Sequence, residues 1–93
     1  MANVYIIKTK DEAAEPLGVA MRFGEADAYM THPFVEGEDT TPEGVLKTLE
    51  SVPPVPLNLI AAYAVPLDIV HQNYTNRSGG RPVVLDYIGV SEQ

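Results

Sequence analysis

The chain has 93 residues, a net charge of −7 and no cysteine, with 45% apolar and 20% charged residues. These proportions are those of a globular protein, and the length predicts one domain over residues 1–93. No apolar run reaches the roughly 18 residues of a membrane span, and the lack of cysteine excludes disulfides, thiolate catalysis and Cys-ligated zinc. Because the N-terminus lacks the pattern of a signal peptide, we expect a soluble cytoplasmic protein.

The first third of the chain predicts three strands. Val4 to Ile7 is rich in β-branched and aromatic residues, and its adjacent apolar positions indicate an interior strand covered on both faces. The polar segment 9–16 is expected to form a loop or a short helix. Leu17–Phe23 alternates apolar and small or polar residues and predicts a second strand, and a third strand is expected over 26–31. The Gly24-Glu25 pair between them predicts a two-residue hairpin turn with Gly24 at a positive φ.

A helix is predicted to begin near Thr40. Thr40 is the expected N-cap, Pro42 lies in the first turn, and Glu43 completes a capping box. Apolar residues then recur at the spacing of one helix face: Val45, Leu46, Leu49 and Val52. The prolines from position 53 onward end the helix and begin a stiff connector.

The remaining segments predict an α+β domain. Residues 57–65 favour a strand by length and alternation, although their alanines leave a helix open. Residues 66–74 fit either a helix beginning at Pro66 or an extended segment, 73–82 predict a loop, and 83–88 predict a last strand. The order predicts a mixed or antiparallel sheet of about four to five strands, with one or two helices packed on one face. The other face then needs polar residues or a partner.

The negative charge is concentrated between residues 11 and 50, which carry ten acids against Arg22 and Lys47. The chain has six Lys and Arg residues and thirteen Asp and Glu residues. This balance argues against direct nucleic-acid binding as its function, because such binding needs clustered cations. It disfavours binding to anionic membranes for the same reason. An acidic surface can instead steer a basic partner protein toward it. A net negative surface also keeps a small protein soluble, without any partner.

One acidic loop lies just before the predicted helix. Its carboxylates, with His32 nearby, are the one set of side chains suited to a hard metal ion, but their spacing matches no EF-hand and we expect no metal. Negative charge also suits the positive end of the following helix. We predict the loop's acids as contacts for a protein partner: Glu36, Glu38 and Asp39.

The segment from Asn76 to Arg81 is the best candidate for binding an anion. Its two glycines allow backbone N–H groups to converge, and its two arginines supply bidentate donors. It lacks the spacing of a P-loop or of a dinucleotide fingerprint, and turn chemistry explains the glycines as well. The predicted ligand-binding residues are His71, Tyr74, Arg77, Ser78, Gly79, Gly80 and Arg81.

Two functions are therefore weighed. The favoured one is a small acidic interaction or regulatory protein that acts by binding a protein partner or by self-association as a homodimer, without a cofactor. Small inhibitors and adaptors of mobile elements and regulatory systems share this general character. The alternative is an anion- or nucleotide-binding protein, or a small enzyme, that uses the Asn76–Arg81 loop with His71. Asp68 could orient His71 as a base, but no serine stands in a nucleophile context, so no catalytic residue is assigned.

Overall fold

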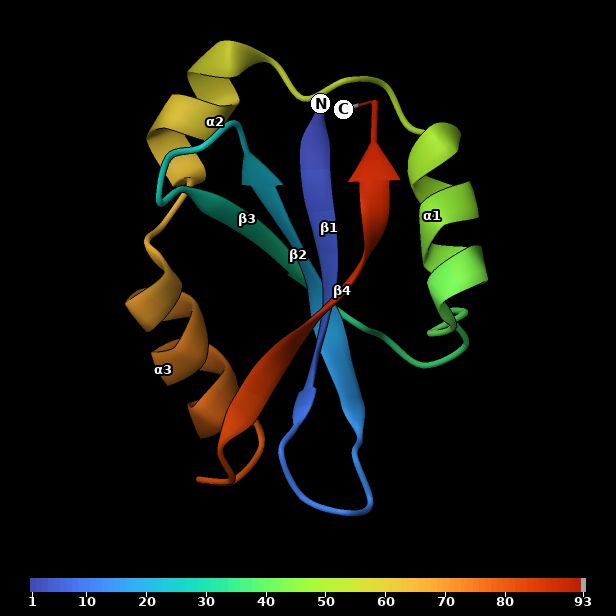
Figure 1. The fold of residues 1–93 in the computed structure, drawn as a ribbon, viewed down its shortest axis with the longest axis vertical. Helices are drawn as coiled ribbons and strands as arrows, with labels where there is room; N and C mark the ends of the chain where they lie inside the picture. Colours follow the sequence, from blue (N-terminus) through green and yellow to red (C-terminus); the bar gives the residue numbers. More distant parts are fainter. Residues whose placement is uncertain (93) are drawn as a thin grey trace.

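The computed structural model describes residues 1–92, which form one antiparallel sheet and three helices (Figure 1). In chain order the elements are β1 (Ala2–Thr9), β2 (Pro16–Phe23), β3 (Tyr29–Pro33), α1 (Pro42–Glu50), α2 (Leu57–Tyr63), α3 (Leu67–Arg77) and β4 (Val83–Ser91). The strand order is β3-β2-β1-β4, and every neighbouring pair is antiparallel. The predicted α+β class and the interior position of β1 are confirmed.

Helices cover both faces of the sheet, whereas one or two helices on a single face were predicted. Val4 and Ile6 of β1 pack with Val45 of α1 on one face. Ile7 packs with Val70 of α3 on the opposite face, because successive strand residues point to opposite sides. Figure 1 shows α1 and α3 on either side of the sheet. The second face is covered because residues 57–77 form two helices.

The hairpin between β2 and β3 is present, but its two-residue turn is wrong. Arg22 lies opposite Tyr29 at the end of the ladder, so residues 24–28 form the connection. Gly24 has the expected positive φ, at +66°. The Arg22 guanidinium donates hydrogen bonds to the carbonyl oxygens of Glu25 and Ala26, and these bonds stabilise the longer loop.

Helix α1 begins one residue later than predicted. Thr41 is the N-cap, its hydroxyl oxygen accepts a hydrogen bond from the Gly44 N–H at 3.1 Å, and Pro42 occupies the first turn. Asp39 Oδ1 accepts both the N–H and the hydroxyl of Thr41, at 2.9 and 2.7 Å. Because Asp39 holds Thr41 in the cap position, the third helical residue is Gly44, and the capping box of Thr40 with Glu43 is wrong.

The chain after the prolines departs furthest from the sequence prediction. The strand predicted over 57–65 is wrong, because Leu57–Tyr63 forms helix α2. Within this segment, Val65 alone pairs with the sheet, through a bridge to Tyr29. Residues 66–74 were predicted as either a helix or an extended segment, and they contain most of helix α3. This helix continues to Arg77, through residues that were predicted as a loop. Within residues 1–92, no helix combines the length and hydropathy that crossing a bilayer requires.

Candidate functional site

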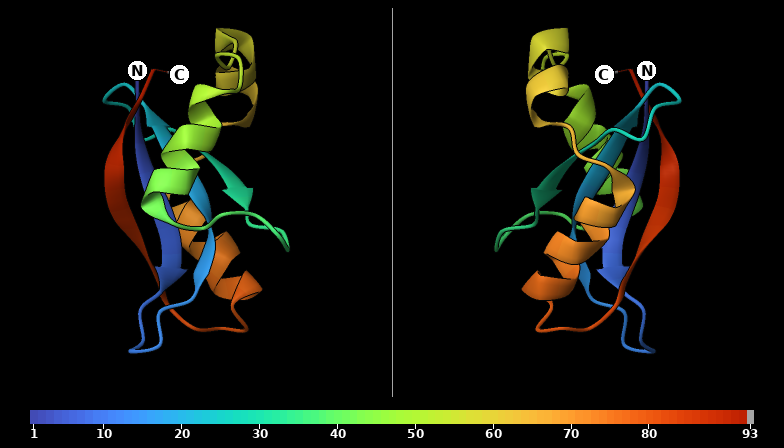
Figure 2. Two further views of the ribbon diagram at one scale, coloured as in Figure 1. Left: turned by 90° about the vertical axis from the view of Figure 1, so that its right-hand side faces the viewer. Right: turned by 90° about the vertical axis from the view of Figure 1, so that its left-hand side faces the viewer.

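An apolar groove lies beside α1 on the face that this helix covers only in part. Leu46 of α1 approaches Gly89 of β4, so the helix lies over the β1–β4 half of the sheet. The half formed by β2 and β3 lines a groove next to the helix, and Figure 2 shows how α1 lies against these strands. The groove has a volume of about 540 Å³. This α1–β3 groove is lined by Val19, Met21, Met30, Thr31, His32, Phe34, Glu38, Asp39, Val45, Thr48, Leu49 and Val52.

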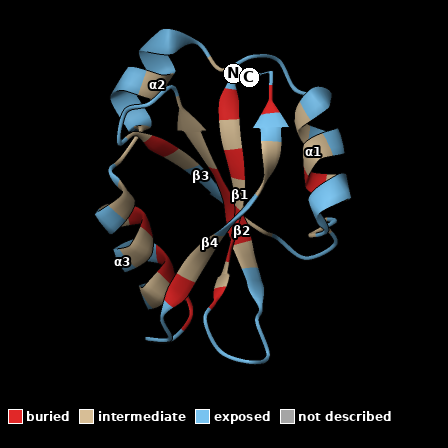
Figure 3. Cartoon of the chain, in the orientation of Figure 1, coloured by how far each residue is buried: buried red, intermediate tan, exposed pale blue. Residues whose placement is uncertain are grey.

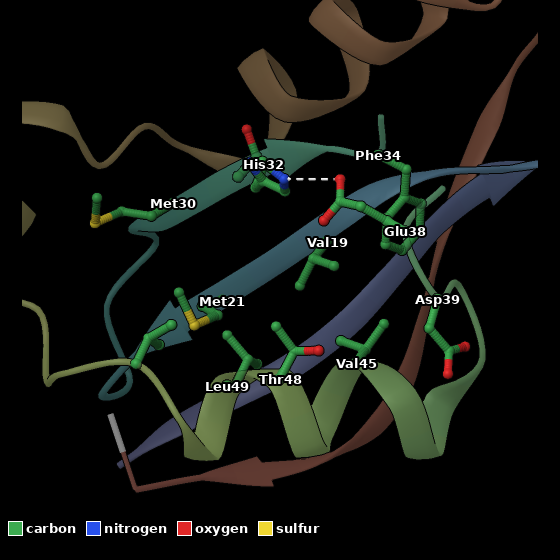
Figure 4. A pocket seen from close by; sticks show the side chains of 12 residues that line it. Val19, Met21, Met30, His32, Phe34, Glu38, Asp39, Val45, Thr48 and Leu49 are labelled. Atoms are coloured by element: carbon green, nitrogen blue, oxygen red, sulfur yellow. Dashed lines mark hydrogen bonds and ion pairs between the residues drawn. The ribbon is translucent and has the colours of Figure 1, made fainter. Parts of the chain in front are cut away.

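The apolar lining of the groove follows from the alternation of residues along β2 and from their pairing with β3. Val19 and Met21 alternate on β2, and their cross-strand neighbours are His32 and Met30 of β3. Because directly opposed residues of an antiparallel pair share a face, all four side chains face the groove. Leu49 projects from α1 toward them (Figure 4). The strands therefore form the floor of the groove, and the helix forms one wall.

Two methionines lie side by side on this floor. Met21 and Met30 are paired across β2 and β3, and both side chains are partly buried. Met30 lies outside the buried cluster that joins β1, β2 and α1, whereas Met21 packs against it. Methionine is unbranched and polarizable, so it adapts to different apolar partners, as on promiscuous binding surfaces. The floor can therefore accept apolar groups without a fixed shape.

The mouth of the groove carries negative charge. Glu38 Oε1 accepts the Val35 N–H at 2.7 Å and lies 3.2 Å from His32 Nε2 (Figure 4). The Val35 N–H, and then the His32 ring, lower the pKa of Glu38. The hydrogen bonds from Thr41 likewise lower the pKa of Asp39. Both carboxylates are therefore charged at neutral pH beside an apolar surface, Glu38 partly buried and Asp39 exposed to solvent.

The acids predicted as partner contacts are brought together in part. Glu38 and Asp39 line the groove, while Glu36 lies exposed in the preceding loop. The His32–Glu38 pair joins two of the residues weighed as metal ligands. Across the described part of the chain, no three His, Asp or Glu side chains form a group that could hold a metal ion.

The predicted anion loop ends helix α3 in a Schellman motif. Gly80 N–H donates to the Thr75 carbonyl at 2.9 Å, and Gly79 N–H donates to the Asn76 carbonyl at 3.3 Å. Both glycines have positive φ, at +74° and +92°, which explains the Gly-Gly pair. The backbone donors that seemed available to an anion are thus bonded to the helix. The Ser78 hydroxyl donates within the same turn, to the carbonyls of Thr75 and Arg81.

The arginines of this loop also have partners within the chain. Arg81 lies 2.7 Å from Glu15 and 3.6 Å from Asp11, two acids of the loop between β1 and β2. The hydrogen bond to Glu15 raises the pKa of Arg81. The Arg77 guanidinium lies 5.8 Å from the centre of the Tyr74 ring. Arg81 thus joins the two loops at one end of the sheet.

The two remaining predicted ligand residues belong to α3. Tyr74 is 2% exposed in the cluster beneath the helix, where it packs with Ile7 and Val70. Gly18 lets the Tyr74 ring approach, since a Cβ there would lie 2.9 Å from Tyr74 Cε2. His71 is partly buried on the same helix. These residues lie on the α3 face, opposite the groove.

Sequence patterns predicted parts of the groove, namely one face of α1 and the alternation of β2, but they indicated no role for Met21, Met30 or Phe34. Phe34 follows β3 directly, and its N–H donates to the Leu17 carbonyl at 2.9 Å. The expected uncovered face did not point here, because α3 covers that face and the groove lies on the face that α1 covers in part.

No protein-family model matches this chain, and searches of curated proteins and of solved structures also find no match. The function must therefore be argued from the groove itself.

Proposed function

We propose that this chain is a small acidic interaction protein that binds a partner protein by accepting its apolar side chains in the α1–β3 groove. The open groove is the observation that carries the proposal. Its volume of about 540 Å³ lies within the range of binding sites in proteins. Contiguous apolar surface that stays open to solvent on a folded domain commonly marks an interaction site.

The charge at the mouth suggests the chemistry of the partner. Glu38 and Asp39 stay ionised beside the apolar floor, and residues 11–50 hold ten of the thirteen acids of the chain. A partner segment with lysine or arginine beside its apolar anchors would place opposite charges together at the rim. Such pairs increase the association rate and favour one class of partner, while burial of the anchors supplies most of the affinity.

This mode of action suits an adaptor or an inhibitor. The partner would bury apolar anchors against Met21, Met30 and Leu49, and no bond would be made or broken. In most interfaces a few buried anchors carry most of the binding free energy, so a groove of this size is sufficient for a regulatory contact.

A pair of model peptides tests the proposal. One amphipathic peptide carries leucines at helical spacing between lysines, and its matched counterpart replaces each lysine with glutamate. We expect the lysine peptide to bind at least about tenfold more tightly in fluorescence anisotropy, with an affinity that falls as salt screens the charges. Equal binding of both peptides would remove the role assigned to the rim.

Two protein variants locate the binding surface. Met30→Asp places a charge on the groove floor, and Val90→Asp places the same charge on β4, where Val90 is 46% exposed. Val90 pairs with Asn3, so it lies on the face away from the groove. Both variants gain equal charge for a cationic peptide, so only burial in the groove predicts a loss for Met30→Asp alone. Similar affinities for the two variants would contradict the proposal.

A further inference from the structure

Helix α2 exposes apolar side chains that the fold leaves uncovered. Leu57 is 84% exposed, Tyr63 68% and Leu59 40%, and no residue of the helix is buried. Figure 3 shows the helix almost entirely in the colours of exposed and intermediate residues. A helix that is apolar around its circumference is normally buried. This one lies at the surface of the molecule.

The chain segment that contains α2 carries no charge. Residues 51–67 contain no Asp, Glu, Lys or Arg, in a chain where one residue in five is charged. A helix of seven residues is also too short to be stable in water without packing. Its attachment to the sheet is the pair of hydrogen bonds between Val65 and Tyr29, at 2.8 and 2.9 Å. Exposed apolar surface on a short, uncharged helix needs an apolar partner surface.

The groove is such a surface, and it lies close to α2 along the chain. Val52 lines the groove, and α2 begins five residues later, after a connector of three prolines and one valine. In the views of Figure 2, α2 stands at one end of α1, beyond the strands. The helix and the groove therefore belong to the same end of the molecule, as a reciprocal contact between two identical chains requires.

We propose that α2 of one copy lies in the α1–β3 groove of a second copy, and that α2 of the second copy lies in the groove of the first. A two-fold axis relates the two contacts, and this reciprocal docking is called the helix exchange below. At 1.5 Å per residue, seven residues give α2 a length of about 10 Å, shorter than the nine-residue α1 that would flank it. Leu59 and Tyr63 are four residues apart and share one face, so they can enter the groove together. Because α2 has no charge, this docking buries no ion beside Glu38.

The edge formed by β4 is less suited to self-association. Strand β4 lies at the edge of the sheet, where a second copy could extend the ladder. However, the register of β4 shifts opposite Val4 and Tyr5, and Gly89 has a φ of +145°. Bulges of this kind interrupt the hydrogen bonds that edge pairing needs. Helix exchange uses a surface without such an interruption.

The inference rests on the proposed function, since both place an apolar segment in the same groove. It adds that self-association covers the groove until a partner displaces α2. The two contacts differ in their response to salt. Two chains of charge −7 repel each other, so salt strengthens the dimer, whereas salt weakens the binding of a cationic partner.

Sedimentation with two variants tests the exchange. The first carries Leu59→Asp with Tyr63→Asp on α2, and the second carries Met30→Asp in the groove. We expect the wild-type chain to double its mass between micromolar and millimolar concentrations, while each variant alone stays monomeric. Mixing the two variants keeps one of the two helix–groove contacts, so the mixture should associate more weakly than the wild type but more strongly than either variant alone. Val90→Asp is the matched control and dimerises like the wild type.

Three results would contradict the proposed dimer. A wild-type chain that stays monomeric, an α2 variant that still dimerises, or a mixture that associates no more than either variant alone at millimolar concentration would overturn the exchange. A circular dichroism spectrum unchanged from the wild type shows that each variant is folded before it is mixed. The lysine peptide separates the two proposals, because it should still bind the monomeric α2 variant, whose groove is intact. Loss of the dimer with retained peptide binding overturns only the exchange, whereas an α2 variant that binds no peptide overturns the proposed function.

Discussion

The groove predicts a sharp difference between two apolar truncations. Met30 is partly buried on the groove floor, whereas Ile7 is fully buried between β1 and α3. A fully buried side chain of this size stabilises the fold by about 1.5–3 kcal/mol, so Met30, partly open to solvent, should contribute about 1 kcal/mol. Ile7→Ala also leaves a cavity and should cost about 2–5 kcal/mol.

Thermal and urea unfolding of both variants measure this difference. For a domain of this size, a loss of 1 kcal/mol lowers Tm by about 4–8 °C. We therefore expect a decrease of that order for Met30→Ala and a decrease at least twice as large for Ile7→Ala. If Met30→Ala is as damaging as Ile7→Ala, the groove is closed in solution, and the reasoning that makes it a binding surface is wrong.

Three further predictions test the surroundings of the site. Gly18→Ala should lower stability by about 1–3 kcal/mol in urea unfolding, since its Cβ would overpack Tyr74, and a more stable variant would contradict the packing. The pKa of Glu38 is lower in the folded chain than in the unfolded chain. The bond from the Val35 N–H to the Glu38 carboxylate therefore stabilises the loop fully at pH values above the ordinary carboxyl pKa. This stabilisation is lost as the pH falls through the pKa that Glu38 has in the folded chain. The protection of the Val35 amide from hydrogen exchange, taken relative to its intrinsic exchange rate at each pH, should therefore decrease as the Glu38 carboxylate is protonated, and a protection that does not change with pH would contradict the assignment. Inorganic phosphate should leave Tm unchanged, whereas a rise that Arg81→Ala abolishes would favour the anion-binding alternative.

Local sequence patterns predicted the elements whose conformation is decided locally. The β-branched run around Val4 and the alternation of β2 predicted their strands. The Thr-Pro start predicted α1 to within one residue. The hairpin was predicted, but the length of its connecting loop was not. That length depends on the carbonyl groups to which the Arg22 side chain bonds, and the spacing of apolar residues carries no information about such bonds.

The prediction failed where distant contacts decide the conformation. The alternation of 57–65 is typical of a strand, but the segment pairs with the edge strand β3 only through the bridge between Val65 and Tyr29. Residues Leu57–Tyr63 form their hydrogen bonds internally, as a helix. The arginine loop likewise depended on Glu15, which lies 66 residues from Arg81 in the sequence. The groove itself depends on which half of the sheet α1 covers, which only the folded chain shows.

Methyl NMR of the methionines tests the binding surface most directly. The chain has three methionines, two on the groove floor and Met1 at the chain end, where it is 78% exposed. On addition of the lysine peptide, the methyl signals of Met21 and Met30 should shift together and saturate with the same affinity, while Met1 stays unchanged. Binding of the peptide without movement of the Met21 and Met30 signals would show that the partner surface lies elsewhere on the molecule.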